Sequence, residues 1–184
     1  AMPDFERDAY AVTGQTFALG AIPRLKWIER HLPDVYARTA RMCMLSDWIV
    51  ARLSGEIACD PSNGGTSGLL ALDSRTWDAD IARRAGIDPA ILPPVHETGT
   101  AIGRVTAAAA ADTGLAVGTP VVVGGGDVQL GALGLGVGRA GEAAVLGGTF
   151  WQEVVNMPRP TADPAMRVRV NPHVVPGLSQ AEGI

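Results

Sequence analysis

The chain has 184 residues, of which 47% are hydrophobic and 18% are charged, so it is long and apolar enough to bury a packed core. Its formal net charge is −4 and its lysines and arginines form no run, which argues against a nucleic acid partner because phosphate backbones bind basic surfaces. No apolar stretch reaches the length of a membrane span and no signal peptide is visible, so we predict a cytoplasmic protein without a membrane partner.

The spacing of apolar residues and of helix-capping residues predicts a series of helices. An apolar stripe at helical spacing indicates a helix that begins near Pro23 and that Pro33 ends, with a second short helix after it. Ser46 and Thr76 are expected to cap later helices, and Gly55 is expected to end the first of these. These and the remaining predicted helices cover residues 47–53, 77–85, 88–92 and 107–111.

Short apolar runs predict strands between these helices, at residues 41–45, 57–59, 69–72, 102–106, 119–123, 142–151, 167–170 and 174–175. The polar, glycine-rich stretch 60–68 is expected to be a loop whose side chains bond its own backbone. The turn at residues 114–119 leads into the next predicted strand, and we expect a boundary near Gly118 between two domains, residues 1–118 and 119–184.

The two cysteines and three histidines show no metal-binding spacing. We interpret Cys43 and Cys59 as reduced structural thiols, because disulfides are rare in cytosolic proteins. His31, His96 and His173 lie far apart in the sequence, and each is interpreted as a surface or loop residue and not as a ligand.

The strand at 119–123 ends in Gly124-Gly125-Gly126-Asp127, which places one carboxylate beside backbone that has no side-chain bulk. Such a carboxylate suits a base that takes a proton from a hydroxyl group next to a nucleotide phosphate. The alternative is a structural aspartate in a turn. The strand at 142–151 likewise ends in Gly147-Gly148-Thr149, so the two strands are interpreted as two walls of one phosphate-handling cleft.

Taken together, these stretches resemble the FGGY family of carbohydrate kinases, and the resemblance extends over nearly the whole chain. The motifs that carry it are Thr13-Gly14-Gln15, Pro23-Arg24-Leu25-Lys26-Trp27, Ser46-Asp47-Trp48, Asp60-Pro61-Ser62-Asn63, Gly124-Gly125-Gly126-Asp127 and Gly147-Gly148-Thr149. Some of them, with Arg169-Val170-Asn171-Pro172-His173, resemble a member that phosphorylates a small linear dione.

The resemblance implies an α/β fold of the ribonuclease-H-like (actin/sugar-kinase) type with two domains, and a reaction that uses ATP and Mg²⁺. Asp127 matches the catalytic aspartate of the family and, by the same resemblance, lies near the magnesium ion. Gly148 and Thr149 match the residues that approach the ATP phosphates, and amides exposed at a glycine turn are anion donors.

The expected substrate is a small sugar-like molecule, held by residues near Asp127 and by one segment of the first domain. Gln129 and Gln152 carry amides that both donate and accept hydrogen bonds, as binding of sugar hydroxyls requires. Trp151 is a candidate for an apolar wall, although an aromatic residue there is as often part of a core. Leu19 and Gly20 occupy the region where the first domain of the family touches substrate.

The chain departs from the family because no Asp-x-Gly-Thr phosphate loop precedes Thr13 and no adenosine-binding glycine cluster follows before residue 184. We therefore expect an internal fragment with an incomplete fold that is inactive on its own. Its exposed strand edges are expected to favour a homo-oligomer. Two alternatives to the dione kinase stay open, a pentulose or polyol kinase and a non-catalytic binding module.

Overall fold

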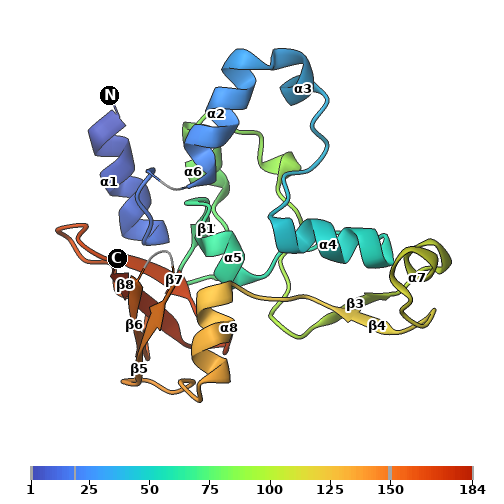
Figure 1. Ribbon diagram of the computed structural model, residues 1–184. Coiled ribbons are helices and arrows are strands. Elements are labelled where there is room, and N and C mark those ends of the chain that lie inside the picture. The colour runs from blue at the N-terminus through green and yellow to red at the C-terminus, as the bar shows by residue number, and fades with distance from the viewer. Residues whose placement is uncertain (1, 19, 149–150, 184) are drawn as a thin grey trace.

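The computed structural model describes residues 2–18, 20–148 and 151–183, with side chains from Asp4 onward (Figure 1). The helices are α1 (Met2–Thr13), α2 (Ala21–His31), α3 (Pro33–Ala37), α4 (Leu45–Ser54), α5 (Pro61–Gly65), α6 (Ala79–Arg84), α7 (Ala107–Thr113) and α8 (Asp127–Gly134), with one 3-10 turn, η1 (Pro89–Ile91). The strands are β1 (Leu70–Ala71), β2 (Thr76–Trp77), β3 (Ala101–Arg104), β4 (Pro120–Val122), β5 (Ala143–Gly147), β6 (Trp151–Met157), β7 (Arg169–Pro172) and β8 (Ser179–Gly183).

The strands form two two-stranded sheets and one four-stranded sheet, and all their pairings are antiparallel. β1 pairs with β2, β3 pairs with β4, and the four-stranded sheet has the order β5-β6-β8-β7. The predicted domain boundary near Gly118 lies in the segment that connects β3 to β4, close to the pair formed by Arg104 and Pro120. The boundary stays a prediction, and so does the homo-oligomer expected from exposed strand edges.

Helix α5 lies near the centre of the molecule, where the other parts meet (Figure 1). It packs against β1 and β2 as well as β7, and α8 lies along the four-stranded sheet next to β5. Two separate hydrophobic clusters form the cores of two other regions of the molecule. One gathers α1, α2 and α6 around Leu69 and Ile81, and the other joins α4, β4 and α7 through Val50 and Val121. The site region therefore sits between two independent cores.

Several predicted elements are confirmed, because their local signals are strong. Helices α2, α3, α4 and α7 form where they were expected, and Gly55 ends α4 in the left-handed conformation.

The exposed Cys43 and the buried Cys59 are both free thiols. Of the helices in the described residues, none combines the length and the apolar character that a membrane span requires.

Other predictions are wrong, mostly because a neighbouring acid provides the cap. The N-cap of α4 is Met44 and not Ser46, and the Met44 amide donates to Asp47 (2.9 Å). Asp78 and not Thr76 caps α6, since Asp78 accepts hydrogen bonds from two amides of the first turn and Thr76 belongs to β2. Helix α4 therefore begins earlier than predicted and α6 begins later. Residue propensity alone does not reveal these differences.

Four predicted segments have a different conformation from the one expected. Residues 41–44 lie outside any sheet, and 57–59 contributes only the single bridge of Cys59 to Val95. The strand predicted at 174–175 is a turn, and the chain resumes as β8 at Ser179. The loop predicted at 60–68 contains α5, while α1 was not predicted at all.

Gly14 follows α1 at the point where this helix meets β7. Its φ of +69° is in the left-handed region, and its carbonyl oxygen accepts a hydrogen bond from the Val170 amide (2.9 Å). A methyl group on Gly14 would lie 2.5 Å from the carbonyl oxygen of Val170 and 2.8 Å from its Cβ. Glycine is therefore required here both by the backbone angle and by the space.

Replacement of Gly14 by alanine is expected to destabilise the fold more than the same change at Gly55, which has a similar φ of +82° but no described atom within 4 Å of the place a methyl group would take. Gly55→Ala carries the cost of a left-handed residue, about 1–2 kcal/mol. Gly14→Ala adds overpacking against β7, about 1–3 kcal/mol more. Urea unfolding of both variants measures the difference, and equal losses would contradict the close approach of Gly14 to Val170.

Candidate functional site

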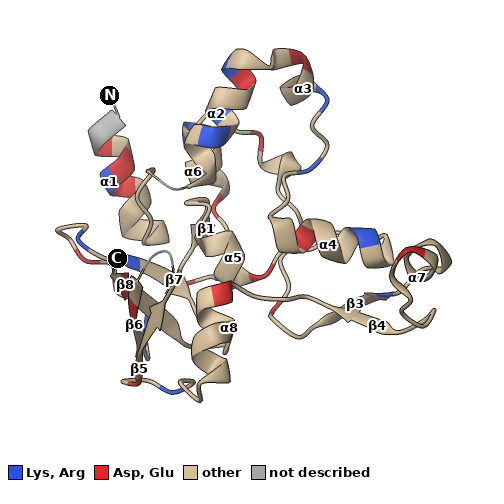
Figure 2. Ribbon diagram, in the orientation of Figure 1, with Lys and Arg blue, Asp and Glu red and all other residues tan. Residues whose placement is uncertain are grey.

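Strand β4 leads through three glycines to Asp127, the first residue of α8. The Asp127 side chain is exposed, and its Oδ1 accepts a hydrogen bond from the Val128 amide (2.9 Å). Figure 2 shows this acidic position at the start of α8, next to α5. A carboxylate placed in this way is accessible to a bound molecule and is able to accept a proton from its hydroxyl group.

The three glycines before Asp127 form with it the Asp127 loop (residues 124–127), and they have different surroundings. A methyl group on Gly125 would lie 2.5 Å from Cγ1 of Val174, and one on Gly126 would overlap Oε1 of Gln129. A methyl group on Gly124 would meet no described atom within 4 Å. The loop is therefore tightly packed at two of its positions and open at Gly124, where a ligand has room to approach the backbone.

The second glycine-rich strand end lies at the same end of the α8–β5 pair as Asp127. A short connection after Gly134 returns the chain, so that β5 runs back along α8 (Figure 1). Gly131 of α8 lies against Leu146 of β5. β5 then ends at Gly147 and is followed by Gly148, and both are exposed. Thr149 lies outside the described residues.

The three candidate substrate residues after Asp127 have distinct environments. Gln129 is 2% exposed, and its Nε2 donates to Gln180 (3.1 Å) and to Glu182 (2.5 Å). Gln152 is half-buried on β6, while the neighbouring Trp151 is 69% exposed. Because successive residues of a strand point to opposite faces, the side chains of residues 151 and 152 do not line one wall together.

Gly20 lies at the start of α2, in close contact with the segment that follows α5. It is buried, and a methyl group at its position would lie 2.9 Å from the carbonyl oxygen of Ser67. The same carbonyl oxygen accepts a hydrogen bond from the Ala21 amide (2.8 Å). Leu19, the other candidate of this segment, lies outside the described residues.

Helix α5 begins at a buried carboxylate and contacts the Asp127 loop. Asp60 is 1% exposed and caps α5, and the following Ser62 accepts a hydrogen bond from the Gly126 amide (2.7 Å). Asn63 donates from Nδ2 both to Asp60 (2.8 Å) and to Ser46 (3.1 Å). The expectation that this stretch bonds its own backbone is confirmed, and its contact with Gly126 adds a link that the sequence did not reveal.

A second buried acid, Asp47, lies close to this cluster. Burial raises the pKa of Asp47 to about 6, and the nearby negative charge of Asp60 acts in the same direction, while the Met44 amide opposes both. Burial also raises the pKa of the Cys59 thiol, with help from the charges of Asp47 and Asp60. The thiol is therefore held in its neutral form.

A buried polar network behind the Asp127 loop was not predicted from the sequence. Its side chains each expose at most 4% of their surface, and they connect α8 to β8, β7 and the segment after α1. The members are Gln15, Gln129, Asn156, Asn171, Gln180 and Glu182. The alternation of Gln180 and Glu182 along one strand face could have indicated it, because two long polar side chains at this spacing share one face.

His173 lies in a loop, as predicted, but it is fully buried and not at the surface. Its Nδ1 accepts a hydrogen bond from the Val175 amide (3.0 Å), and Arg75 donates to its carbonyl oxygen (2.9 Å). Burial lowers the pKa of His173, and the charge of Arg75 lowers it further. The imidazole is therefore held in its neutral form.

Within the described residues, no group of three or more histidine, cysteine, aspartate or glutamate side chains is placed to hold a metal ion. In kinases, Mg²⁺ is held by one or two carboxylates together with substrate phosphates. The exposed Asp127 is a carboxylate of that kind.

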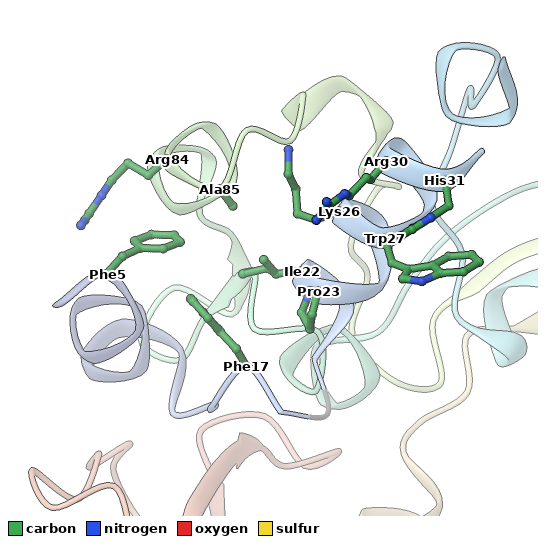
Figure 3. Close-up of a pocket in the computed structure, with 10 residues that line it drawn as sticks. All are labelled: Phe5, Phe17, Ile22, Pro23, Lys26, Trp27, Arg30, His31, Arg84 and Ala85. Atoms are coloured by element: carbon green, nitrogen blue, oxygen red, sulfur yellow. The ribbon is translucent and has the colours of Figure 1, made fainter. Parts of the chain in front are cut away.

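A cavity of about 620 Å³ lies between α1, α2 and α6 (Figure 3). Phe5, Phe17 and Ile22 point toward its centre, and Lys26 and Arg84 lie along its rim. The rings of Phe5 and Phe17 are 5.3 Å apart, and the Arg84 guanidinium lies over the Phe5 ring at 4.9 Å. Of the described residues that the sequence indicated for phosphoryl transfer, neither Asp127 nor Gly148 lines this cavity.

Comparison with protein families gives one match that covers most of the chain. Residues 5–134 match the N-terminal domain of the FGGY family of carbohydrate kinases. The chain is 60% identical over 180 residues to autoinducer-2 kinase of Enterobacter sp. (strain 638) and 59% identical to that of Klebsiella pneumoniae. Each alignment covers 98% of this chain and 34% of the relative, so the chain spans about a third of the length of these curated relatives.

Solved structures of sugar kinases have the same fold. Xylulose kinase from Rhodospirillum rubrum is 35% identical with a TM-score of 0.89, over 97% of this chain and 36% of that protein. Glycerol kinase from Plasmodium falciparum, solved with ADP, is 17% identical with a TM-score of 0.85 over 97% and 37%, and shows the fold alone. The predicted α/β fold of sugar-kinase type is therefore confirmed.

The raised pKa of Asp47 predicts a pH-dependent stability that Asp47→Asn removes. Because the folded state holds the proton more tightly than the unfolded state, the contribution of Asp47 is most favourable below about pH 4 and is lost as the pH rises through about 6. The free energy of unfolding is expected to fall by about 3 kcal/mol over this pH range. Urea unfolding of both proteins between about pH 4 and pH 7.5 measures it, and parallel curves for protein and variant would contradict the raised pKa.

Proposed function

The chain belongs to the FGGY family of carbohydrate kinases, and on this premise we propose that the protein that carries it transfers the terminal phosphate of ATP to a hydroxyl group of autoinducer-2. Identities of 57–60% to several autoinducer-2 kinases support this substrate, a small linear sugar-like molecule. We expect the reaction to take place in the cytoplasm, as part of the same proposal.

The observation that carries the proposal is the position of Asp127. Its carboxylate is exposed at the start of α8, shortly after an open glycine position, and at the end of the α8–β5 pair where Gly147 and Gly148 are also exposed. In this mechanism Asp127 accepts the proton of the attacking substrate hydroxyl, while the phosphate of the nucleotide lies near the glycine-rich strand ends. Positioning and charge neutralisation supply most of the rate in phosphoryl transfer.

Carbohydrate kinases of this family use ATP, generally with a divalent metal. We assign the backbone amide of Gly148 and the hydroxyl of Thr149 to the ATP phosphates, and Asp127 to the neighbourhood of Mg²⁺. When bound, the metal ion neutralises the charge on the phosphate oxygens. An exposed glycine after a strand end suits the first of these assignments, because its amide is accessible to an anion.

For the substrate we assign Gln152 and Trp151, which lie on opposite sides of β6, and the first-domain residues Leu19 and Gly20. Gln129 was expected to contact substrate as well. Because its amide donates to Gln180 and Glu182, a supporting role behind the binding site suits it better.

The second candidate function is a pentulose kinase, and one observation favours it. The xylulose kinase from Rhodospirillum rubrum is 35% identical and superimposes closely, with a TM-score of 0.89. The higher identity to autoinducer-2 kinases favours autoinducer-2 as the substrate. A binding module without turnover is the third candidate, and an assay of ATP consumption distinguishes it from both kinases.

The complete protein is expected to consume ATP in the presence of autoinducer-2 precursor, and Asp127→Asn is expected to lower kcat by about a hundredfold to ten-thousandfold, because the variant lacks the base. Asp112→Asn is the matched control, since Asp112 is an exposed acid in α7. The measurement is coupled ATP consumption with autoinducer-2 precursor and xylulose as parallel substrates. Turnover of xylulose alone would move the assignment to a pentulose kinase, and no turnover by folded protein would favour the binding module.

Gly124→Ala tests whether the open glycine faces the ligand. Because a methyl group there meets no described atom within 4 Å, the free energy of unfolding is expected to change by less than ~0.5 kcal/mol. The same methyl group would occupy ligand space, so KM for ATP or for substrate is expected to rise. Steady-state kinetics and urea unfolding of the variant measure both effects. Unchanged kinetics would remove Gly124 from the proposed site.

A further inference from the structure

We propose that Ser62 is a positioning residue that holds the Asp127 loop in its reactive geometry, a role that rests on the proposed function of Asp127. Ser62 belongs to α5, in the part of the chain that was expected only to brace itself. Its hydroxyl oxygen accepts a hydrogen bond from the Gly126 amide (2.7 Å), across 64 positions of sequence. Gly126 is the residue directly before Asp127.

The hydrogen bond to Ser62 comes from the backbone amide of the residue just before α8. Gly126 is the N-cap of this helix, and as a glycine it offers no side chain to fix the helix end. Ser62 is 0% exposed and Gly126 is buried, so water does not replace the hydrogen bond if it is lost. The position of Asp127 therefore depends on a residue from another helix.

Asp60 fixes the orientation of the Ser62 hydroxyl. An ionised carboxylate only accepts hydrogen bonds, so in the short contact between Ser62 Oγ and Asp60 Oδ2 the hydroxyl is the donor. The same carboxylate accepts from the Ser62 amide (2.7 Å) and from Asn63 Nδ2 (2.8 Å), which holds it in place. A lone pair of the Ser62 oxygen is left for the Gly126 amide, and the two hydrogen bonds reinforce each other.

Helix α5 is itself tightly packed, so the position of Ser62 is fixed. A methyl group on Gly64 would lie 2.7 Å from Cδ1 of Leu70, and one on Gly65 would lie 2.6 Å from Cδ of Pro172. The helix is thus held between β1 on one side and β7 on the other. An error of about 1 Å in the position of a reacting group costs up to about a hundredfold in rate, so such a fixed point matters for Asp127.

Ser62→Ala removes the acceptor for Gly126, and Ser67→Ala is the matched control. Ser67 is 1% exposed, donates to the Gly64 carbonyl and accepts from the Leu69 amide, but its side chain makes no hydrogen bond to the Asp127 loop in the part of the chain that the structure describes. In the complete protein, Ser62→Ala is expected to lower kcat by about tenfold to a hundredfold, with KM for ATP within about twofold. Ser67→Ala is expected to leave kcat within about twofold while lowering the melting temperature at least as much.

A double-mutant cycle separates positioning from general damage. If Ser62 acts through Asp127, then Ser62→Ala has no further effect on the residual turnover of Asp127→Asn. Equal losses of kcat in the two backgrounds would overturn the proposal, and so would a Ser62→Ala protein with unchanged kcat. Full activity of Asp127→Asn would instead overturn the role of Asp127 in the proposed function, and with it the positioning role.

Hydrogen exchange gives a readout that does not depend on turnover. The amide of Gly126 is expected to exchange at least about tenfold faster in Ser62→Ala than in Ser67→Ala, because only the first variant frees it. Mass spectrometry of peptides that span residues 124–130 measures this in the complete protein. Equal exchange in the two variants would overturn the contact on which the proposal is based.

Discussion

The Asp60 carboxylate accepts hydrogen bonds from the amides of Ser62 and Asn63 and from the Ser62 hydroxyl, and the geometry of the candidate site depends on this cap. It begins α5, and α5 in turn touches β1, β7 and the loop before Asp127. A buried carboxylate is costly unless it is satisfied in this way. One buried and fully hydrogen-bonded acid thus anchors a rigid central helix, around which two separate hydrophobic cores are arranged.

The region behind Asp127 is organised mainly by polar contacts. Glu182 accepts from Gln129 and Asn171 and pairs with Arg169 (3.3 Å), so its charge is neutralised within the sheet. A network of this kind is favourable only when every member is satisfied, and it then permits few alternative arrangements. The apolar cores supply the bulk of the stability, while this network specifies how α8 lies on the sheet.

The sequence allows the family, the fold and the candidate role of Asp127 to be predicted, because these depend on local motifs. Gly55 ends α4 as expected, since a left-handed C-cap favours glycine wherever it occurs. The partners of Gln129 could not be predicted in the same way. Whether the Gln129 amide faces a ligand or another side chain depends on Gln180 and Glu182 of β8, which lie 51 and 53 positions further along the chain. The contact of Ser62 with Gly126 was missed for the same reason.

The meeting of Gly14 and Gln15 with β7 has a consequence for synthesis on the ribosome. The Gln15 side-chain amide donates to the Val170 carbonyl oxygen (2.8 Å), a partner that is translated 155 positions later. At typical translation rates, that partner emerges on the order of ten seconds after Gln15 does. Until then the end of α1 lacks the strand that contacts it, so this stretch reaches its final structure only after β7 has been synthesised.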